Sequence, residues 1–165
     1  MGLDSLIVDA NVLIDYAETE PQILALVTRF IGPVLIPRPL LHEVQQLSEK
    51  ECRSLGLEVI DMHLELMVEA SALGGALSFE DWLCLLNAKE SAGICVTNDR
   101  RLRKECEASG VKVRWGLELM ADLVRGRKLA PERALDVAWA IQASNPTHIT
   151  PAIIERFERR LEADS

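Results

Sequence analysis

Two short runs of consecutive apolar residues, Leu6-Ile7-Val8 and Ile94-Cys95-Val96, place the strongest constraint on how this chain folds. Strands that are apolar at every position are buried on both faces, as the central strands of parallel sheets are. Val34-Leu35-Ile36, which lies between prolines, is a third run of this type, and weaker candidates are residues 57–60 and 111–113. The sequence therefore predicts a sheet of about four to five strands.

Helical patterns with recognisable ends separate these runs. A proline opens each of the first two, which we expect over residues 21–31 and 39–49, because the first helical turn tolerates a residue without an amide hydrogen. A third helix is expected over residues 62–73, before a pair of glycines, and a fourth runs for about fourteen residues from Ser78. Strands that alternate with helices in this way are typical of an α/β domain with a mainly parallel sheet.

The pattern changes after Trp115. Three further helices are expected and no further strand, over residues 117–125, 131–143 and 150–161. The chain of 165 residues is long enough for one compact domain with a modest addition. We therefore expect an α/β domain over residues 1–115 and a helical C-terminal extension over residues 116–165 that packs on it.

Composition removes several classes of protein. A hydrophobic content of 48% suffices for a packed core, which excludes a disordered chain. No basic segment precedes an apolar one at the N-terminus, and no apolar run approaches the roughly 20 residues that span a bilayer. We therefore expect a cytoplasmic protein that is not embedded in a membrane. The four cysteines form no CxxC pair, which favours neither a disulfide framework nor a zinc site.

The formal net charge of −8 argues by itself against a nucleic-acid substrate, since proteins that bind phosphates non-specifically usually carry a basic surface. The objection weakens if several of the acidic side chains hold metal ions, because bound cations reverse the local potential. Net charge alone therefore does not decide the class of substrate.

Four acidic residues are predicted to meet at one edge of the sheet. Asp9 directly follows the first strand and Asp99 follows residues 94–96 closely, so both lie where a strand ends. Glu43 is placed in the first turns of the helix after the second main strand, and Asp81 begins the helix that runs back into the strand at 94–96. All four thus fall at the carboxyl edge, where open α/β sheets place their sites.

Each of these acids also has an ordinary structural interpretation. Asp81 fits a capping box with the serine three residues before it, and Asp99 fits the cap of the next helix. Glu43 fits a solvated surface acid, and Asp9 fits a turn residue beside Asn11. Together, however, four like charges repel one another unless protons or cations neutralise them. Oxygen ligands without histidine or cysteine select Mg²⁺ or Mn²⁺, so the sequence predicts a site for one of these ions.

With these residues assembled, the chain resembles the PIN-domain proteins, the fold of the VapC-type toxin ribonucleases. The resemblance covers residues 3–115. It rests on the order and spacing of four segments, namely Ile7-Val8-Asp9-Ala10-Asn11, Ile36-Pro37 with Glu43 after it, Leu77-Ser78-Phe79-Glu80-Asp81, and Val96-Thr97-Asn98-Asp99 before Arg101-Leu102.

This resemblance implies a three-layer α/β/α sandwich and a ribonuclease that cleaves RNA phosphodiester bonds with Mg²⁺ or Mn²⁺. It assigns catalytic and metal-binding roles to Asp9, Glu43, Asp81 and Asp99, with Asn11 and Asn98 as auxiliary polar groups. A homodimer and an antitoxin partner are further expectations. The helical tail is longer than in compact toxins, and this departure bears on the toxin role more than on the chemistry.

A positive cluster follows Asp99. Arg100 and Lys104 share one face of the expected helix and are candidates to grip phosphates beside the scissile bond, although a solvated helix face is the ordinary interpretation. Two other functions stay open. One is a PIN fold that binds RNA or protein without cleavage. The other is a receiver-like protein phosphorylated at Asp61, which the lack of a lysine at Arg114-Trp115 disfavours.

Overall fold

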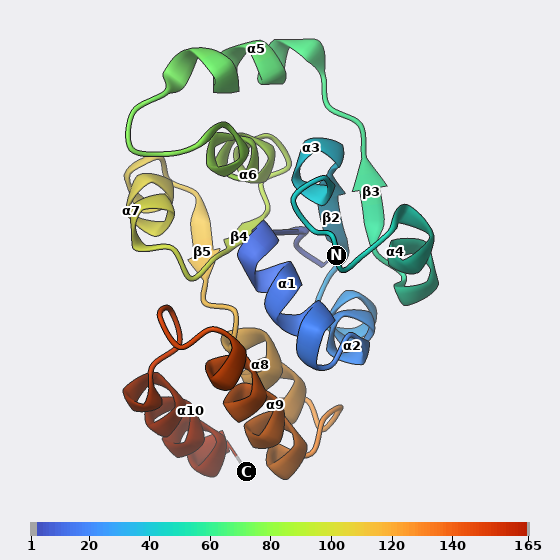
Figure 1. Cartoon of the computed structure of the whole chain (residues 1–165), viewed down its shortest axis with the longest axis vertical. Helices are drawn as coiled ribbons and strands as arrows, with labels where there is room; N and C mark the ends of the chain where they lie inside the picture. The colour runs from blue at the N-terminus through green and yellow to red at the C-terminus, as the bar shows by residue number, and fades with distance from the viewer. Residues whose placement is uncertain (1–2, 165) are drawn as a thin grey trace.

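One sheet of five parallel strands organises the computed structural model, which describes residues 3–164. The strand order is β3-β2-β1-β4-β5 (Figure 1). The strands are β1 Leu6–Val8, β2 Val34–Pro37, β3 Glu58–Ile60, β4 Ile94–Val96 and β5 Lys112–Arg114. Each strand expected from the sequence is present, and every neighbouring pair is parallel. The predicted α/β class is therefore confirmed.

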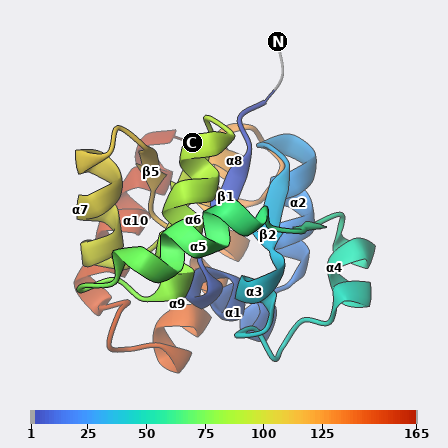
Figure 2. The same ribbon diagram turned by 90° about the horizontal axis from the view of Figure 1, so that it is seen from above.

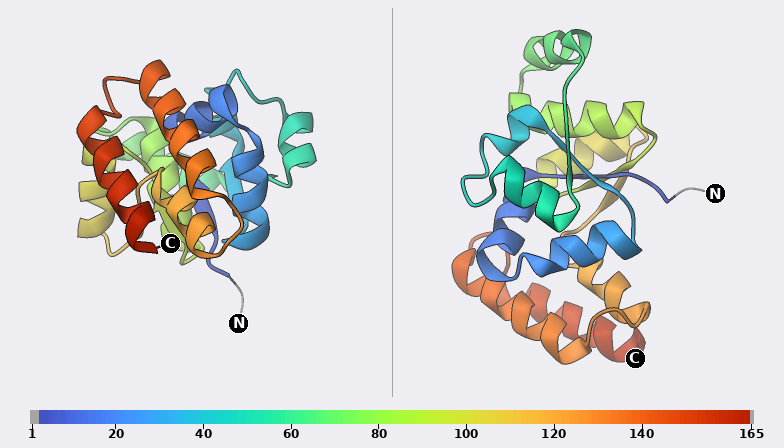
Figure 3. Two further views of the ribbon diagram at one scale, coloured as in Figure 1. Left: turned by 90° about the horizontal axis from the view of Figure 1, so that it is seen from below. Right: turned by 90° about the vertical axis from the view of Figure 1, so that its right-hand side faces the viewer.

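Helices lie on both sides of this sheet. In chain order they are α1 Ala10–Thr19, α2 Gln22–Phe30, α3 Arg38–Leu41, α4 Glu49–Leu55, α5 Leu64–Leu73, α6 Phe79–Glu90, α7 Arg100–Ala108, α8 Glu118–Arg125, α9 Pro131–Ser144 and α10 Pro151–Asp164. Helix α6 packs on β1, β2 and β4, and α7 packs on β5, while α5 crosses over α6 farther out (Figure 2). Helices α1 and α2 occupy the opposite side (Figure 3). The arrangement is compatible with a three-layer sandwich.

The three tail helices form an additional tier below α1 and α2 (Figure 3). Helix α8 contacts α2, α9 contacts α1, and α10 contacts both α8 and α9. Leu119, Leu123, Val137 and Ile141, which the sequence places at helical spacing, are all buried. The tail is thus continuous with the core through its apolar face. Within residues 3–164, no helix combines the length and the apolar character that crossing a membrane requires.

The two central strands define where the chain emerges at the carboxyl edge. Val8 of β1 lies opposite Val96 of β4, and both are fully buried. The backbone amide of Asp9 continues this pairing by donating to the carbonyl of Val96 at 2.9 Å. The residues that follow β1 and β4 therefore leave the sheet side by side.

The prediction of a single helix over residues 39–49 is wrong. Helix α3 ends at Leu41, and residues 42–47 form turns instead. A new helix, α4, begins after Ser48, whose hydroxyl accepts a hydrogen bond from the amide of Glu51 at 3.1 Å. Since such a cap satisfies an otherwise unpaired amide, it fixes a helix start at this serine. Glu43 consequently lies in a turn and not in a helix.

Helix α1 was not among the predicted elements. It starts immediately after β1, with Asp9 as its N-terminal cap residue in an extended conformation. Val12, Leu13 and Tyr16 recur at helical spacing and are buried, so tertiary packing holds the helix in place. A turn residue beside Asn11 was one of the two interpretations left open for Asp9, which instead lies at a direct strand-to-helix junction.

Most apolar side chains of helix α5 are not buried. Ala70 is buried, but Leu73 is exposed. Leu64 and Val68 are exposed as well. Apolar residues therefore lie on both sides of α5, which packs mainly on α6 and not on the sheet.

Candidate active site

The candidate site lies where the strand order reverses direction. From β1 the chain moves outward through β2 and β3, then returns to the other side of β1 as β4 and β5. In open α/β sheets, ligands bind in the crevice outside the carboxyl ends of the strands at such a reversal. Asp9 follows β1 and Asp99 follows β4, so both acids lie at this point of the sheet.

The hydroxyl of Thr97 connects these two segments. It donates a hydrogen bond to Asp9 Oδ2 at 2.8 Å and accepts one from the backbone amide of Asp99 at 3.0 Å. Thr97 is fully buried, and Asp9 is 5% exposed. Sequence analysis gave Thr97 no role of its own, although a hydroxyl between a strand end and an acid is a recognisable signal. In the structure it orients the carboxylate of Asp9.

Burial raises the pKa of Asp9 to about 6. The negative charges of Asp81 and Asp99 raise this pKa further, whereas the hydrogen bond from Thr97 lowers it. The charged form of Asp9 is thus penalised both by removal from water and by like charges nearby. Asp81 and Asp99 thus lie within electrostatic range of Asp9.

Asp81 and Asp99 both cap helices, as their structural interpretations predicted. The backbone amide of Ser78 donates to Asp81 Oδ2 at 3.0 Å, and the amide of Asp81 donates to the Ser78 hydroxyl at 3.1 Å. The amide of Leu102 donates to Asp99 Oδ1 at 2.9 Å. Each cap uses one carboxylate oxygen and fixes the side chain, so capping and a place beside Asp9 are compatible.

Glu43 belongs to the same group of charges despite its exposed position. Partial desolvation raises its pKa, and the charges of Glu80, Asp9 and Asp81 raise it further. Glu80, which directly precedes Asp81, is an acid that sequence analysis left without a role. We refer to Asp9, Glu43, Asp81 and Asp99 as the carboxylate cluster.

The carboxylate cluster contains no balancing positive side chain. Some acids outside the cluster do have basic partners, for example Asp122 and Glu118, which both pair with Arg114. Across residues 3–164, however, none of the four cluster residues forms an ion pair with lysine, arginine or histidine. Like charges that meet in a partly buried position are stabilised only by protons or by a cation.

The donor chemistry of the cluster fits a hard divalent cation, since carboxylate oxygens are the ligands that Mg²⁺ and Mn²⁺ prefer. As they stand, however, the four carboxylates are not arranged to coordinate one cation together. In the described part of the chain, no three histidine, cysteine, aspartate or glutamate side chains form a group that could hold a metal ion. Holding a cation between several of these acids would therefore require their side chains to turn toward one another.

The auxiliary residues have separate positions. Asn11 is exposed in the first turn of α1. Asn98 Oδ1 accepts a hydrogen bond from the amide of Gly116 at 2.9 Å, and the hydroxyl of Tyr16 donates to the carbonyl of Gly116 at 2.7 Å. A Cβ at this glycine would lie 3.2 Å from Asn98 Nδ2 and leave little room. Asn98 therefore braces the loop after β4 against the start of the tail.

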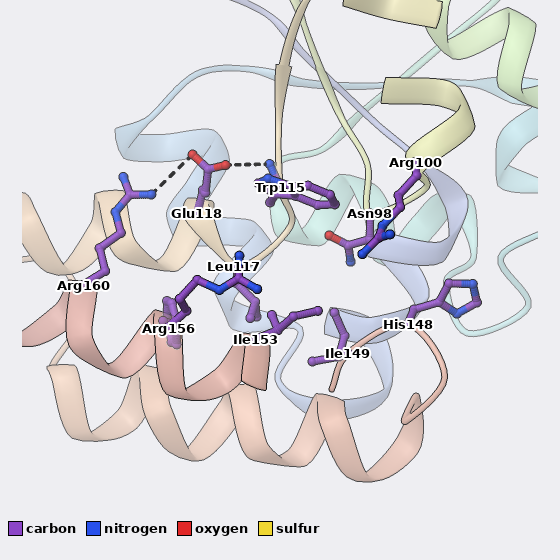
Figure 4. A pocket seen from close by; sticks show the side chains of 11 residues that line it. Asn98, Arg100, Trp115, Leu117, Glu118, His148, Ile149, Ile153, Arg156 and Arg160 are labelled. Atoms are coloured by element: carbon purple, nitrogen blue, oxygen red, sulfur yellow. Dashed lines mark hydrogen bonds and ion pairs between the residues drawn. The ribbon is translucent and has the colours of Figure 1, made fainter. Parts of the chain in front are cut away.

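The two basic residues proposed to bind phosphates, Arg100 and Lys104, have different surroundings. Arg100, the first residue of α7, lines a cavity together with Asn98 and Trp115 (Figure 4). Lys104 is exposed one turn later and does not line it. The helix face that the sequence suggested is thus only partly directed toward the site.

The receiver-like alternative does not agree with the topology. Receivers have the flavodoxin-like strand order 2-1-3-4-5, and this sheet has the order β3-β2-β1-β4-β5. Asp61 follows the edge strand β3 and forms an ion pair with Arg38 at 2.7 Å. It lies two strands away from the reversal point, so it is not placed as a phosphoacceptor.

Comparison with known proteins assigns no family. No protein-family model matches the chain, and no curated protein matches its sequence. Fold and site therefore define a class only, an α/β protein with an all-parallel sheet and an acidic group at its topological reversal.

Proposed function

We propose that this protein is a Mg²⁺- or Mn²⁺-dependent ribonuclease of the PIN-domain type, which hydrolyses RNA phosphodiester bonds at the carboxylate cluster. The single observation that carries the proposal is the buried carboxylate of Asp9, which lies at the reversal point of the sheet among like charges and forms no ion pair with any side chain of residues 3–164. A cation at this position would relieve both penalties on its charged form.

In this proposal Asp9 and Asp99 hold the principal cation, and Glu43 and Asp81 complete the site or orient a water molecule. A bound divalent cation would lower the pKa of a water molecule, which can then act as the nucleophile, and would stabilise negative charge on the phosphate. Thr97 keeps the Asp9 carboxylate in one orientation through its 2.8 Å hydrogen bond. Arg100 lies at the start of α7, directly after Asp99, and attracts the phosphates of the substrate.

Incubation of labelled single-stranded RNA with Mn²⁺ or with EDTA tests the reaction. We expect cleavage with Mn²⁺, none with EDTA, and loss of both cleavage and Mn²⁺ binding in Asp9→Asn. Asp136→Asn is the matched control, since it makes the same chemical change at an exposed position of α9 and should behave as the wild type. Cleavage by Asp9→Asn at the normal rate would show that the mechanism is wrong.

The second candidate is a catalytically silent PIN fold that binds RNA or protein. None of the four acids is replaced in this chain, which favours the enzyme. Tight RNA binding without cleavage in Mg²⁺ or Mn²⁺ would support the silent module instead.

The toxin role, the antitoxin partner, the homodimer and the cytoplasmic location stay predictions from the sequence. A small DNA-binding protein encoded by the adjacent gene, and its co-purification with this chain, would test the antitoxin. Light scattering of the purified protein would test the homodimer.

A further inference from the structure

A cavity of about 410 Å³ opens between the loops after β4 and β5 and helix α10 (Figure 4). Its volume lies in the range of about 300–1,000 Å³ that small-molecule sites occupy. The apolar part of its wall is formed by Leu117 and by the tail residues Ile149, Ile153 and Phe157. We call this the tail pocket, because helix α10 and the loop before it complete it.

Guanidinium groups surround this apolar wall. Arg100 and Arg156 line the tail pocket, and within residues 3–164 neither has a carboxylate partner. Arg160 also lines it and pairs with Glu118 at 3.4 Å. Since Arg114 binds the same carboxylate at 3.0 Å, the one acid in the wall is neutralised. An anionic ligand would therefore meet positive charge here.

Trp115 provides an aromatic surface in the same pocket. Its side chain is 38% exposed, which is unusual in a fold that buries most of its large apolar residues. The guanidinium carbon of Arg103, which does not line the pocket, lies 3.8 Å from the centroid of the indole ring. The backbone amide of Trp115 donates to Glu118 at 3.0 Å. The ring is thus held in place with part of its surface open to a ligand.

The tail pocket adjoins the carboxylate cluster. Asn98 and Arg100, the two neighbours of Asp99 in the chain, both line it. Asn145, in the loop that leads to α10, donates to Asp15 Oδ1 of α1 at 3.1 Å. The charge of Asp9 raises the pKa of Asp15, and the charge of the pocket residue His148 lowers it. The tail and the carboxylate cluster are thus both connected to α1, the tail through Asn145 and the cluster through Asp9, which is the N-terminal cap residue of this helix.

We propose that the tail pocket seats one nucleotide of single-stranded RNA beside the scissile phosphate, with its base against Trp115 and the apolar wall and its phosphate on Arg156 and Arg100. This inference rests on the proposed ribonuclease function. A bare phosphate would leave the indole and the apolar wall uncovered, and an apolar ligand would leave the arginines without partners. A single-stranded nucleotide satisfies both, because its unpaired base offers a face for stacking and its backbone is anionic.

Binding measured in EDTA tests the pocket without the chemistry. Fluorescence anisotropy with a labelled single-stranded RNA octamer compares the wild type with Arg156→Ala and Arg159→Ala. Both variants remove one exposed positive charge from α10, but only Arg156 lines the pocket. We expect Arg156→Ala to weaken binding about threefold to tenfold at low salt and to lower the salt slope by about 1. Equal affinities of the two variants would overturn the proposal.

Tryptophan fluorescence locates the base. We expect unlabelled RNA octamer to quench the emission of the wild type and of Trp139→Phe, which changes an exposed residue of α9, but not of Trp115→Phe. Full quenching in Trp115→Phe would overturn the placement of the base. Equal quenching by 5′-AMP and by the octamer at the same concentration would assign the pocket to a free nucleotide and overturn the RNA seat.

The cleavage assay separates this inference from the proposed function. If the wild type cleaves RNA in Mn²⁺ but Arg156→Ala binds RNA as tightly as the wild type, the ribonuclease function stands and the nucleotide site in the tail pocket is rejected. Loss of affinity in Arg156→Ala, together with no cleavage in Mg²⁺ or Mn²⁺ by the wild type, would retain the seat and reject the ribonuclease.

Discussion

Two surfaces of opposite character meet at Asp99. On one side lies the carboxylate cluster, where neighbouring negative charges help to raise the pKa of Asp9 and of Glu43. None of its four acids forms an ion pair among the described residues. On the other side, the tail pocket presents Arg100 and Arg156 around an apolar wall. The formal net charge of −8 averages over both and describes neither. We propose a cation for the first surface and a phosphate for the second.

The two surfaces also differ in how the chain builds them. Asp9, Asp81 and Asp99 lie at the starts of helices in the sheet domain, so a short stretch of sequence fixes each of their positions, whereas Glu43 lies in a turn. The tail pocket forms only when α10 folds back toward the loops after β4 and β5. The tail is therefore a structural part of the pocket.

Loss of the tail should have the largest effect. Truncation after Trp115 would remove the partners of α1 and α2, so we expect aggregation or loss of a dimer. As a single change, Leu123→Ala removes a side chain that is 1% exposed and should lower the free energy of unfolding by about 2–5 kcal/mol. Trp139→Ala at an exposed position is the control, with a change within about 0.5 kcal/mol. Urea denaturation measures both, and a soluble, monodisperse truncated protein with normal RNA binding would contradict the role of the tail.

The next effect concerns the hydroxyl that supports the cluster. Thr97→Val keeps the shape of the buried side chain but removes the donor to Asp9 Oδ2. An unsatisfied buried group costs about 1–3 kcal/mol, so we expect this loss of stability together with a higher pKa of Asp9. Thr97→Ser retains the hydroxyl and should restore the pKa, although it loses a methyl group. NMR titration of the Asp9 carboxyl carbon gives the pKa directly, and an unchanged value in Thr97→Val would exclude a positioning role.

The sheet and the acidic residues were predictable because each depends on local sequence. Apolar runs identified the strands, and Asp9, Asp81 and Asp99 follow from where those strands and helices end. Helix α1 escaped prediction because its start coincides with the strand end, and the polar pair Asp9 and Asn11 resembles a turn. The break after α3 escaped because the cap at Ser48 competes with a continuous helical pattern.

The basic surface was only partly predictable, for a different physical reason. Arg100 is adjacent to Asp99 in sequence and was found from that proximity. Trp115 and Arg156 lie on separate elements, and only tertiary packing brings them together. A charged residue on an amphipathic tail helix looks the same in sequence whether it faces solvent or a cavity. The signal available in the sequence was a tryptophan close after the last predicted strand.

An effect of similar size follows from the pKa of Asp9. Between its ordinary value of 3.8 and about 6, the folded protein binds more protons than the unfolded chain, so stability falls as the pH rises through this window. Asp9→Asn removes the charge. In EDTA at pH 8 this variant should exceed the wild type by about 1–3 kcal/mol, and at pH 4 the two should converge. Urea denaturation at both pH values checks this, and Mn²⁺ should stabilise only the wild type. An equal difference at pH 4 and pH 8 would show that Asp9 is not the titrating group.

The smallest effect distinguishes the two basic residues of α7. Arg100 lines the tail pocket, whereas Lys104 is exposed outside it. If phosphates are gripped inside the pocket, Arg100→Ala should weaken binding of the RNA octamer about threefold, and Lys104→Ala should change it less than about twofold at the same salt concentration. Mn²⁺ affinity should stay near the wild-type value in both, because neither side chain supplies a carboxylate. Equal weakening by the two substitutions would mean that α7 attracts RNA through its overall charge. Arg100 would then have no special role in the tail pocket.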